Sequence, residues 1–492
     1  MNSLKSIPTD IRLPDIYHQV SKNFKKDDFA NIWLVGGAIR ATILNNPVVD
    51  LDFVIQGNAI ACARYLADEL NADYFTLDAK RGVGRVLLRN EARTVIDISC
   101  LHHNGIESDM LSRDFTINAI AMRCQSPKQI IDPTGGLDDI LRKEIRMVSE
   151  QSFTDDPIRL IRAIRIAVQT GFAIKRNTRT AIRKHVERLG QVSTERVRDE
   201  FMRCLSSKSP VQAIHLLSHL NMMRYILVDW DNNNVEQALS KLRALESLVA
   251  IILPKKTPDA ACEYALGLFA STAGQFRPEL EKHLSETVSD KSNRRRRYQL
   301  MYVAVLLRSL SVSSERKRLV NLLKLSKSEC AMISAMTIIE DLPESLSIAA
   351  DSLIRKHKST QADSISSTRA RSIHTYFRKN STVGIEMGLL TLAEILSKYG
   401  PQIPHELWER KLAAMFALLD GYFDRYDQLI RPQDIINGND LIQEFGYNPG
   451  QEIGAILQQI TEAQAAGEVL DRDAALVMAR QLHASSKAKY DQ

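Results

Sequence analysis

Short apolar segments alternate with turns and amphipathic stretches over the first part of the chain, a pattern typical of an α/β region. The apolar runs at 31–37 and 48–55 predict strands, and "AIRATIL" between them predicts a helix. A second helix is predicted at "NAIACARYLADELN". Three more strands are predicted after it, at 72–78, 84–90 and 93–101.

From residue 154 onward the apolar positions recur at helical spacing. In "TDDPIRLIRAIRIAVQTG", Thr154 is the predicted N-cap, Pro157 lies in the first turn and Gly171 ends the helix. A polar, serine-rich loop is predicted at 358–371. The pattern therefore predicts an α+β N-terminal region followed by a long all-α body, in four parts: 1–150, 151–240, 241–364 and 365–492.

Two carboxylates interrupt the apolar strand at 48–55. Residues two apart on a strand point to the same face, so Asp50 and Asp52 stand side by side while Leu51 faces the opposite way into a core. Adjacent carboxylates repel each other, which suggests a cation between them, and oxygen ligands on a rigid strand suit magnesium. The alternative is the solvated face of an amphipathic strand.

Composition narrows the class of protein. The chain has 492 residues, more than one core usually holds, and 44% of them are hydrophobic. It has neither an apolar run of about 18 residues nor a signal-peptide core, so a cytoplasmic protein without a membrane span is expected. Six cysteines without a Cys-x-x-Cys indicate neither a zinc site nor a disulfide framework. Basic clusters at 291–299 and 314–327 are either solvated faces or contacts for a phosphate backbone.

Two further segments carry candidate chemistry. In "RDFTINAIA", Arg113 offers a guanidinium for phosphates, and Asp114 offers a carboxylate that can accept a hydrogen bond from a ribose hydroxyl. The alternative there is a capped helix start. In "IIDPTGGLDDILRKEIRMV", Asp132 and the turn after it form either a wall of a site or an ordinary turn.

The order of these motifs closely resembles that of the class II tRNA nucleotidyltransferase/poly(A) polymerase family, within the DNA polymerase beta superfamily. The motifs are Gly-Gly-x-x-Arg, Asp-x-Asp, Arg-Asp-Phe-Thr-Ile-Asn-Ala, Asp-Pro-x-x-Gly, Asp-Asp-Pro-x-Arg and "STERVRDEF". The resemblance implies a polymerase-beta-like mixed sheet in the N-terminal head. It implies that Gly36 and Gly37 form a turn approached by a nucleoside triphosphate and that Asp50 and Asp52 carry two magnesium ions. Asp97 is the candidate third catalytic carboxylate, with a surface residue at a strand edge as the alternative.

The same resemblance implies how bases are selected. Asp156 and Arg159 match the family's nucleotide-selecting motif and are expected one turn apart on a helix. Because a carboxylate only accepts hydrogen bonds and a guanidinium only donates them, the pair accepts C and A and refuses U and G. Glu195 and Arg196 would brace this pair. The implied nucleotide-binding residues are Gly36, Gly37, Arg40, Arg113, Asp114, Asn118, Asp155, Asp156, Arg159 and Arg162.

The resemblance continues in the C-terminal half. Residues 369–396 and 435–476 resemble segments that would hold the acceptor and T arms of tRNA, mostly through phosphates. Relatives with this tail often carry a metal-dependent phosphohydrolase in the middle region. Here Arg308 and Ser309 stand where its His-Asp pair would be, which predicts a helical scaffold without a metal.

Three departures and the intact motifs together define the expected function. Ala41 and Ser112 replace an acidic and a basic partner of the triphosphate, and the connection at 100–112 is short, as in CC-adding members. The expected activity is template-independent, magnesium-dependent transfer of CMP and/or AMP from CTP and/or ATP to tRNA 3′ ends, with release of pyrophosphate. The alternatives are a poly(A) polymerase acting on general RNA and a non-catalytic RNA-binding scaffold. The sequence leaves the added nucleotides and the oligomeric state open.

Overall fold

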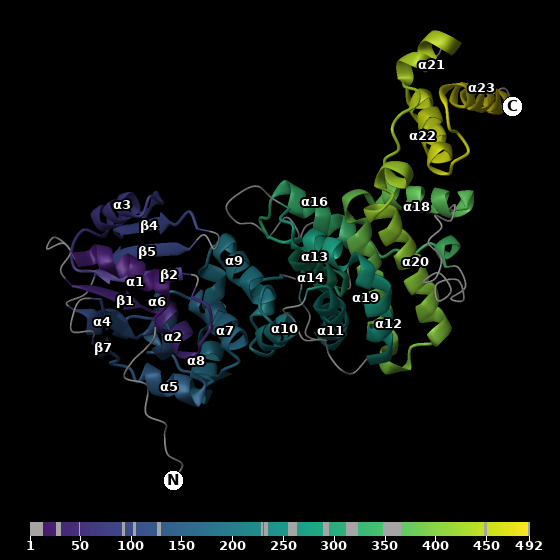
Figure 1. Cartoon of the computed structure of the whole chain (residues 1–492). Coiled ribbons are helices and arrows are strands. Elements are labelled where there is room, and N and C mark those ends of the chain that lie inside the picture. Colours follow the sequence, from purple (N-terminus) through teal and green to yellow (C-terminus); the bar gives the residue numbers. More distant parts are fainter. Residues whose placement is uncertain are drawn as a thin grey trace. The chain divides into compact units, whose positions relative to one another are not determined.

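Figure 1 shows the computed structural model of the chain, which divides into two compact units, Met1–Ile226 and Leu227–Gln492. The four-part division expected from the sequence stays a prediction within these units. Three predicted segments fall partly outside the described residues, at 291–294, 314–322 and 358–365. The structure describes residues 13–25, 31–48, 50–90, 94–101, 105–124, 129–227, 230, 235–253, 263–288, 295–310, 323–347, 366–446 and 450–490.

The first unit is built on a seven-stranded sheet with the strand order β3-β4-β5-β2-β1-β6-β7. β2 and β5 run parallel, whereas the other neighbouring strands are antiparallel. The predicted strands are present, so the mixed sheet expected for the head is confirmed. The strands are β1 (Ile32–Val35), β2 (Asp50–Ile55), β3 (Asp73–Asp78), β4 (Val83–Leu87), β5 (Val95–Cys100), β6 (Ala121–Arg123) and β7 (Ile130–Ile131).

One face of the sheet packs against helix α3 (Ala59–Glu69). Phe53 of β2 is buried on this face, in the same cross-strand row as Gly84 of β4. α3 approaches so closely that a Cβ on Gly84 would lie 2.5 Å from the Cβ of Ala63. Because side chains alternate along a strand, Asp50 and Asp52 project from the opposite face.

The segment at 151–171 folds differently from the prediction. Helix α6 (Gln151–Asp155) ends at Asp156, whose backbone is extended, with φ −146° and ψ 93°. Helix α7 (Arg159–Thr170) begins only after Pro157. The predicted N-cap at Thr154 is therefore wrong, and its hydroxyl donates to the carbonyl of Gln151 inside α6. Proline disfavours the helical conformation in the residue before it, which divides the expected helix in two. The predicted stop at Gly171 is confirmed, with φ +72°.

The remaining helices of the first unit lie beside the sheet or follow it in the chain, up to residue 219. The helix predicted at 38–44 is present as α2, and α7 packs against α9 and α10. Two short strands, β8 (Glu144–Ile145) and β9 (Ala173–Ile174), pair in parallel beside α7. The helices are α1 (Asp15–Lys22), α2 (Gly37–Ile43), α4 (Ile106–Leu111), α5 (Gly136–Arg142), α8 (Arg176–His185), α9 (Thr194–Leu205) and α10 (Pro210–His219).

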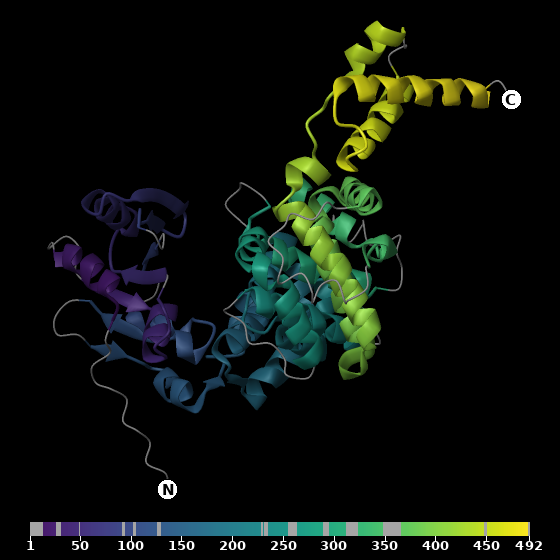
Figure 2. The ribbon, with the colours of Figure 1, turned by 45° about the vertical axis from the view of Figure 1, so that its right-hand side comes forward.

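The second unit is built from helices, as the all-α body predicted (Figure 2). Its last three helices share a small hydrophobic core of their own, which includes Leu441, Ile456 and Ala475. Among the described residues, no helix is long and apolar enough to cross a membrane. The helices are α11 (Val235–Ile252), α12 (Glu263–Ala273), α13 (Arg277–Ser285), α14 (Arg297–Arg308), α16 (Lys327–Met336), α18 (Ser367–Asn380), α19 (Gly384–Tyr399), α20 (His405–Phe423), α21 (Gly438–Phe445), α22 (Gln451–Ala465) and α23 (Arg472–Tyr490).

Candidate active site

A glycine turn brings the end of β1 next to the carboxylates of β2. β1 ends at Val35, which lies opposite Asp52 in the sheet. Gly36 follows with φ +75°, a conformation that only glycine adopts without strain. A Cβ on Gly36 would lie 3.1 Å from Nη1 of Arg113 and 3.7 Å from Oδ2 of Asp52. The turn therefore presents bare backbone beside a carboxylate and a guanidinium.

Three carboxylates crowd one face of the sheet. Asp50 and Asp52 share a strand face, and Asp52 lies directly opposite Asp97 of β5. Burial, Asp97 and Asp50 raise the pKa of Asp52 to about 6, although Arg113 lowers it. Burial and Asp97 also raise the pKa of Asp50. Charges that repel in this way favour a bound cation.

Asp97 differs from Asp50 and Asp52 in its contacts, and its role as a third catalytic carboxylate stays a prediction. Asp97 accepts two hydrogen bonds from Arg85 of β4, at 2.7 and 2.8 Å, so its carboxylate already has a cationic partner. Among the described residues, no group of three or more His, Cys, Asp or Glu side chains is arranged to hold a metal. The pair Asp50 and Asp52 fits the habit of magnesium, which takes one or two carboxylates together with substrate phosphates.

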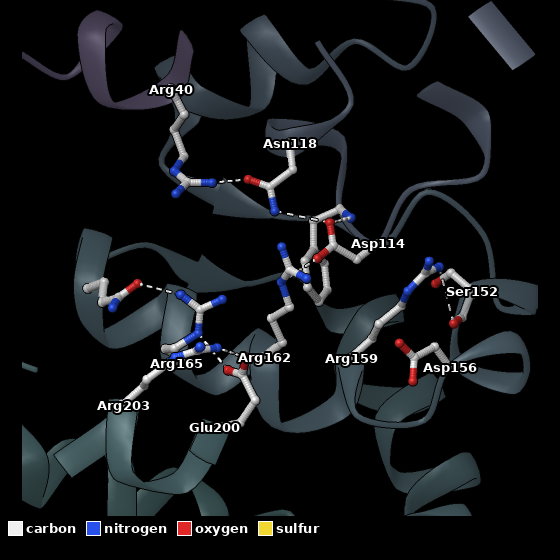
Figure 3. A network of polar contacts seen from close by, with 12 residues as sticks. Arg40, Asp114, Asn118, Ser152, Asp156, Arg159, Arg162, Arg165, Glu200 and Arg203 are labelled. Atoms are coloured by element: carbon white, nitrogen blue, oxygen red, sulfur yellow. Dashed lines mark hydrogen bonds and ion pairs between the residues drawn. The ribbon is translucent and has the colours of Figure 1, made fainter. Parts of the chain in front are cut away.

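The "RDFTINA" segment ties the glycine turn to α7. Thr116–Asn118 form a short 3-10 helix, and the carboxylate of Asp114 accepts hydrogen bonds from the backbone of Phe115 (2.8 Å) and from Nδ2 of Asn118 (3.0 Å). Asn118 in turn accepts a hydrogen bond from Arg40 of α2, and Arg162 of α7 forms an ion pair with Asp114 at 2.9 Å (Figure 3).

Charge pairing dominates the environment of Asp114. The carboxylate is buried, and burial by itself would raise its pKa. Arg162, Asn118 and the backbone of Phe115 outweigh this and hold the pKa of Asp114 below its usual range. In this arrangement the carboxylate orients Arg162 and Asn118 toward the space in front of Asp52.

Several of the side chains described above line one cavity of about 480 Å³, a size common for small-molecule sites. Six of the residues expected from the sequence lie in its wall: Gly37, Arg40, Asp50, Asp52, Asn118 and Arg162. The cavity is also lined by three residues that the sequence motifs did not indicate, namely Arg165, Gln169 and Arg203. The spacing of Arg159, Arg162 and Arg165 along α7 was the available signal, because residues three apart share a helix face.

The wall of the cavity is strongly cationic. Burial lowers the pKa of Arg40 to about 10, with Arg165 and Arg162 adding to the effect, so the group stays charged at neutral pH. Glu200 of α9 accepts hydrogen bonds from Arg165 (2.7 Å) and Arg203 (2.8 Å) and fixes both beside the cavity (Figure 3). Glu200 therefore pairs with these two arginines instead of forming the ordinary surface pair with Arg196 that its spacing allows.

The expected selector lies at the junction of α6 and α7. Asp156 stands before the helix and Arg159 is its first residue, so the expectation that both lie one turn apart on a helix is wrong. The predicted brace by Arg196 of α9 is present as an ion pair with Asp156 at 2.8 Å. Arg159 donates to the carbonyls of Ser112 (3.1 Å) and Ser152 (3.4 Å).

The two other predicted candidates have local partners. Asp155 accepts a hydrogen bond from Gln151 within α6, at 2.7 Å. Asp132 accepts hydrogen bonds from the backbone of Gly136 (2.8 Å) and Leu137 (2.9 Å) at the start of α5. The latter contacts favour the ordinary turn over the wall of a site.

Family models match three parts of the chain. One described as the poly A polymerase head domain matches residues 32–146, one for the RNA- and SrmB-binding site of polymerase A matches 171–233, and one for tRNA nucleotidyltransferase domain 2 matches 418–479. The first match contains the sheet, the glycine turn and the three carboxylates. The second contains α9 with Arg196 and Arg203.

Similar proteins extend these matches along the whole chain. A CC-adding tRNA nucleotidyltransferase of Synechocystis is 27% identical over 91% of this chain and 93% of its own length. A second CC-adding tRNA nucleotidyltransferase, from Geobacter sulfurreducens, is 27% identical over 89% of each chain. The solved structure of a CCA-adding enzyme with ATP shares the fold with a TM-score of 0.62 at 20% identity, covering 96% of this chain and 95% of that one.

Proposed function

This chain belongs to the tRNA nucleotidyltransferase/poly(A) polymerase family, and on that premise we propose that it transfers CMP and/or AMP to the 3′ ends of tRNA without a template. The observation that carries the proposal is the cavity in which Asp50 and Asp52 face Arg40, Arg162, Arg165 and Arg203. Paired carboxylates beside a cationic wall are what a triphosphate with its metal ions requires. A cytoplasmic location goes with this role.

The reaction uses the two sides of the cavity differently. The 3′ hydroxyl of the RNA attacks the α-phosphorus, a new O–P bond forms, the bond to pyrophosphate breaks and the hydroxyl proton is released. Nucleotidyltransferases of this family use a divalent metal, and we propose magnesium. Asp50 and Asp52 would hold it, and it would supply positive charge for the attacking and leaving oxygens. Arg40, Arg162 and Arg203 neutralise and orient the phosphates of the nucleotide.

Base selection is assigned to Asp156 and Arg159. The ion pair with Arg196 holds the carboxylate of Asp156, while the hydrogen bonds to Ser112 and Ser152 hold Arg159. Both side chains are thus oriented before a nucleotide enters, although they come from a helix junction instead of one helix face. Preorganised donors and acceptors of this kind discriminate between bases by hydrogen-bond order.

Two observations favour addition of C over addition of A or a poly(A) tail. The relatives from Synechocystis and Geobacter sulfurreducens, which align over 91% and 89% of this chain, are named CC-adding tRNA nucleotidyltransferases. The connection between β5 and the "RDFTINA" segment is short. The match at 418–479 to a tRNA nucleotidyltransferase domain favours tRNA over general RNA and supports a tRNA-binding role for the last helices.

A nucleotide-addition assay tests the proposal. The purified protein is incubated with tRNAs that lack CCA, CA or A, with CTP and ATP offered separately, and the products are sequenced. We expect CTP to complete the CC part and ATP to be used poorly on a tRNA that already ends in CC. Long A tails on unrelated RNA would indicate a poly(A) polymerase. Absence of any product with wild-type protein in magnesium would leave the binding scaffold as the function.

A further inference from the structure

The carboxylate face of the sheet continues beyond the cavity onto β4 and β3, which α3 covers on the opposite face. The register aligns Asp52 with Asp97, Asp97 with Arg85, and Arg85 with Phe75 of the edge strand β3. Residues in one cross-strand row point to the same face. Phe75 therefore lies on the same face as the carboxylates, roughly 14 Å from Asp52 at about 4.8 Å per strand.

This end of the face is apolar and open to solvent. Phe75 is 53% exposed and Leu77, where the strand register shifts, is 52% exposed. On the opposite face, Tyr74 of the same strand lies under Arg64 of α3. Large aromatic side chains are not usually left open on an edge strand, where they invite unwanted contacts. An aromatic side chain exposed on the same face as the proposed nucleotidyl-transfer site is a candidate contact for a bound ligand.

Three cationic residues lie on the same hairpin as Phe75, and Arg85 stands directly opposite it in the sheet. Arg85 uses Nε and Nη2 for Asp97, which leaves the remaining donors of its guanidinium for another anion. The β3–β4 hairpin carries Lys80 and Arg81 at its exposed tip, and the carboxylate of Asp78 fixes that tip by accepting hydrogen bonds from both backbone N–H groups, at 3.0 Å each. An aromatic side chain bordered by cations is the arrangement with which proteins hold single-stranded nucleic acid.

We propose that Phe75 is a stacking platform for one of the last unpaired nucleotides at the 3′ end of the RNA, with Arg85 and the hairpin tip contacting its phosphates. The inference deepens the proposed function, on which it rests, by assigning where the RNA end lies. The nucleotide occupies the arginine-lined side of Asp52 and the RNA end occupies the β3–β4 side. Stacking tolerates any base, which suits a site that must hold successive products.

The first test separates RNA binding from nucleotide binding in steady-state kinetics. Phe75→Ala should raise KM for a tRNA lacking CCA by roughly five- to hundredfold, the range for loss of one base–aromatic stack. KM for CTP should stay within about twofold, and Phe75→Trp should restore most of the RNA affinity. The matched control is Leu141→Ala, because Leu141 is also exposed (41%) but belongs to α5 instead of the β3–β4 hairpin. Leu141→Ala should leave both KM values unchanged.

The second test does not depend on turnover. A tRNA acceptor minihelix with 2-aminopurine at its 3′-terminal or penultimate nucleotide should change its fluorescence on binding wild-type protein, and Phe75→Ala should abolish the change at one of the two positions. An unchanged signal and an unchanged RNA KM in Phe75→Ala would overturn the inference. So would a wild-type dimer that Phe75→Ala dissociates without loss of RNA affinity, because β3 would then pair chains. Failure of the wild type to add nucleotides would instead reject the proposed function.

Discussion

Arginines beside carboxylates occur in both units, but they are used in opposite ways. In the second unit, the side chain of Arg308 is 1% exposed and donates to the carbonyls of Met336 (2.7 Å) and Ile338 (2.8 Å) and to Glu394 (2.8 Å). In the first unit, the side chains of Arg162 and Arg203 are 43% and 62% exposed and face the cavity.

The difference shows when a charged cluster is a binding site. A buried guanidinium whose donors point at protein acceptors has nothing left for a ligand and serves the packing of the helices around it. Arginines that share one carboxylate at the rim of a cavity keep donors for an anion, as Arg165 and Arg203 do around Glu200. The sequence resemblance implies that Arg308 stands where related chains would carry a His-Asp pair. The predicted absence of phosphohydrolase chemistry stays a prediction, but the contacts of Arg308 support it.

The largest loss of activity is expected from removing Asp52, one of the two proposed metal-binding carboxylates. Asp52→Ala should lower the rate of CMP addition by roughly a thousandfold or more, since metal stabilisation of the transition state accounts for several kcal/mol. Binding of tRNA, measured by filter retention, should change little because it rests on other surfaces. Substantial turnover by this variant in magnesium would remove Asp52 from the metal site.

A matched pair of variants tests whether the buried arginine serves stability and the exposed arginine serves nucleotide binding. Arg308→Met should destabilise the protein by about 3–5 kcal/mol, because Glu394 and two carbonyls lose their partner in a buried setting. Arg203→Met should change stability by less than about 1 kcal/mol, because the Arg203 side chain is 62% exposed and Glu200 keeps Arg165 as a partner, yet should raise KM for CTP. Denaturant unfolding measures the first quantity and steady-state kinetics the second. The opposite outcome in either variant would contradict the distinction.

Selectivity should respond to the junction of α6 and α7. Arg159→Ala removes a base-reading guanidinium and should reduce the preference for CTP over UTP by roughly ten- to a hundredfold, since each such contact is worth about 1–3 kcal/mol. Binding of the triphosphate should be affected much less. The measurement is kcat/KM for the four triphosphates on a tRNA lacking CCA. Unchanged exclusion of UTP and GTP would place selection elsewhere.

The smallest effect concerns pH and stability. The pKa of Asp52 in the folded protein, about 6, lies above its ordinary value of 3.8, so the folded state binds the proton more tightly than the unfolded state. The contribution of Asp52 to stability is therefore present at low pH and lost as pH rises from about 4 to about 6. Asp52→Asn should stabilise the metal-free protein at pH 7.5 by about 1–2 kcal/mol, and the gain should vanish below pH 4 in thermal denaturation scans.

Local sequence patterns predicted the paired carboxylates and the order of the strands in the head. Strand alternation placed Asp50 and Asp52 on one face, and the glycine pair marked the turn beside them, because both follow from local backbone geometry. Pro157 also indicated the break between α6 and α7, because proline disfavours a helical conformation in the residue before it. The continuous helical spacing of the apolar residues suggested a single helix instead.

Only the tertiary structure decided which distant charges meet. The sequence pattern did not distinguish Arg85 from other strand residues, and the register of β4 and β5 places it opposite Asp97. Arg203 reaches the cavity only through the packing of α9 on α7. The exposure of Phe75 likewise depends on β3 forming the edge of the sheet. Such contacts join residues far apart in the chain, so the local periodicity of the sequence does not predict them. Strand order and helix packing, which the whole sequence fixes together, bring them about.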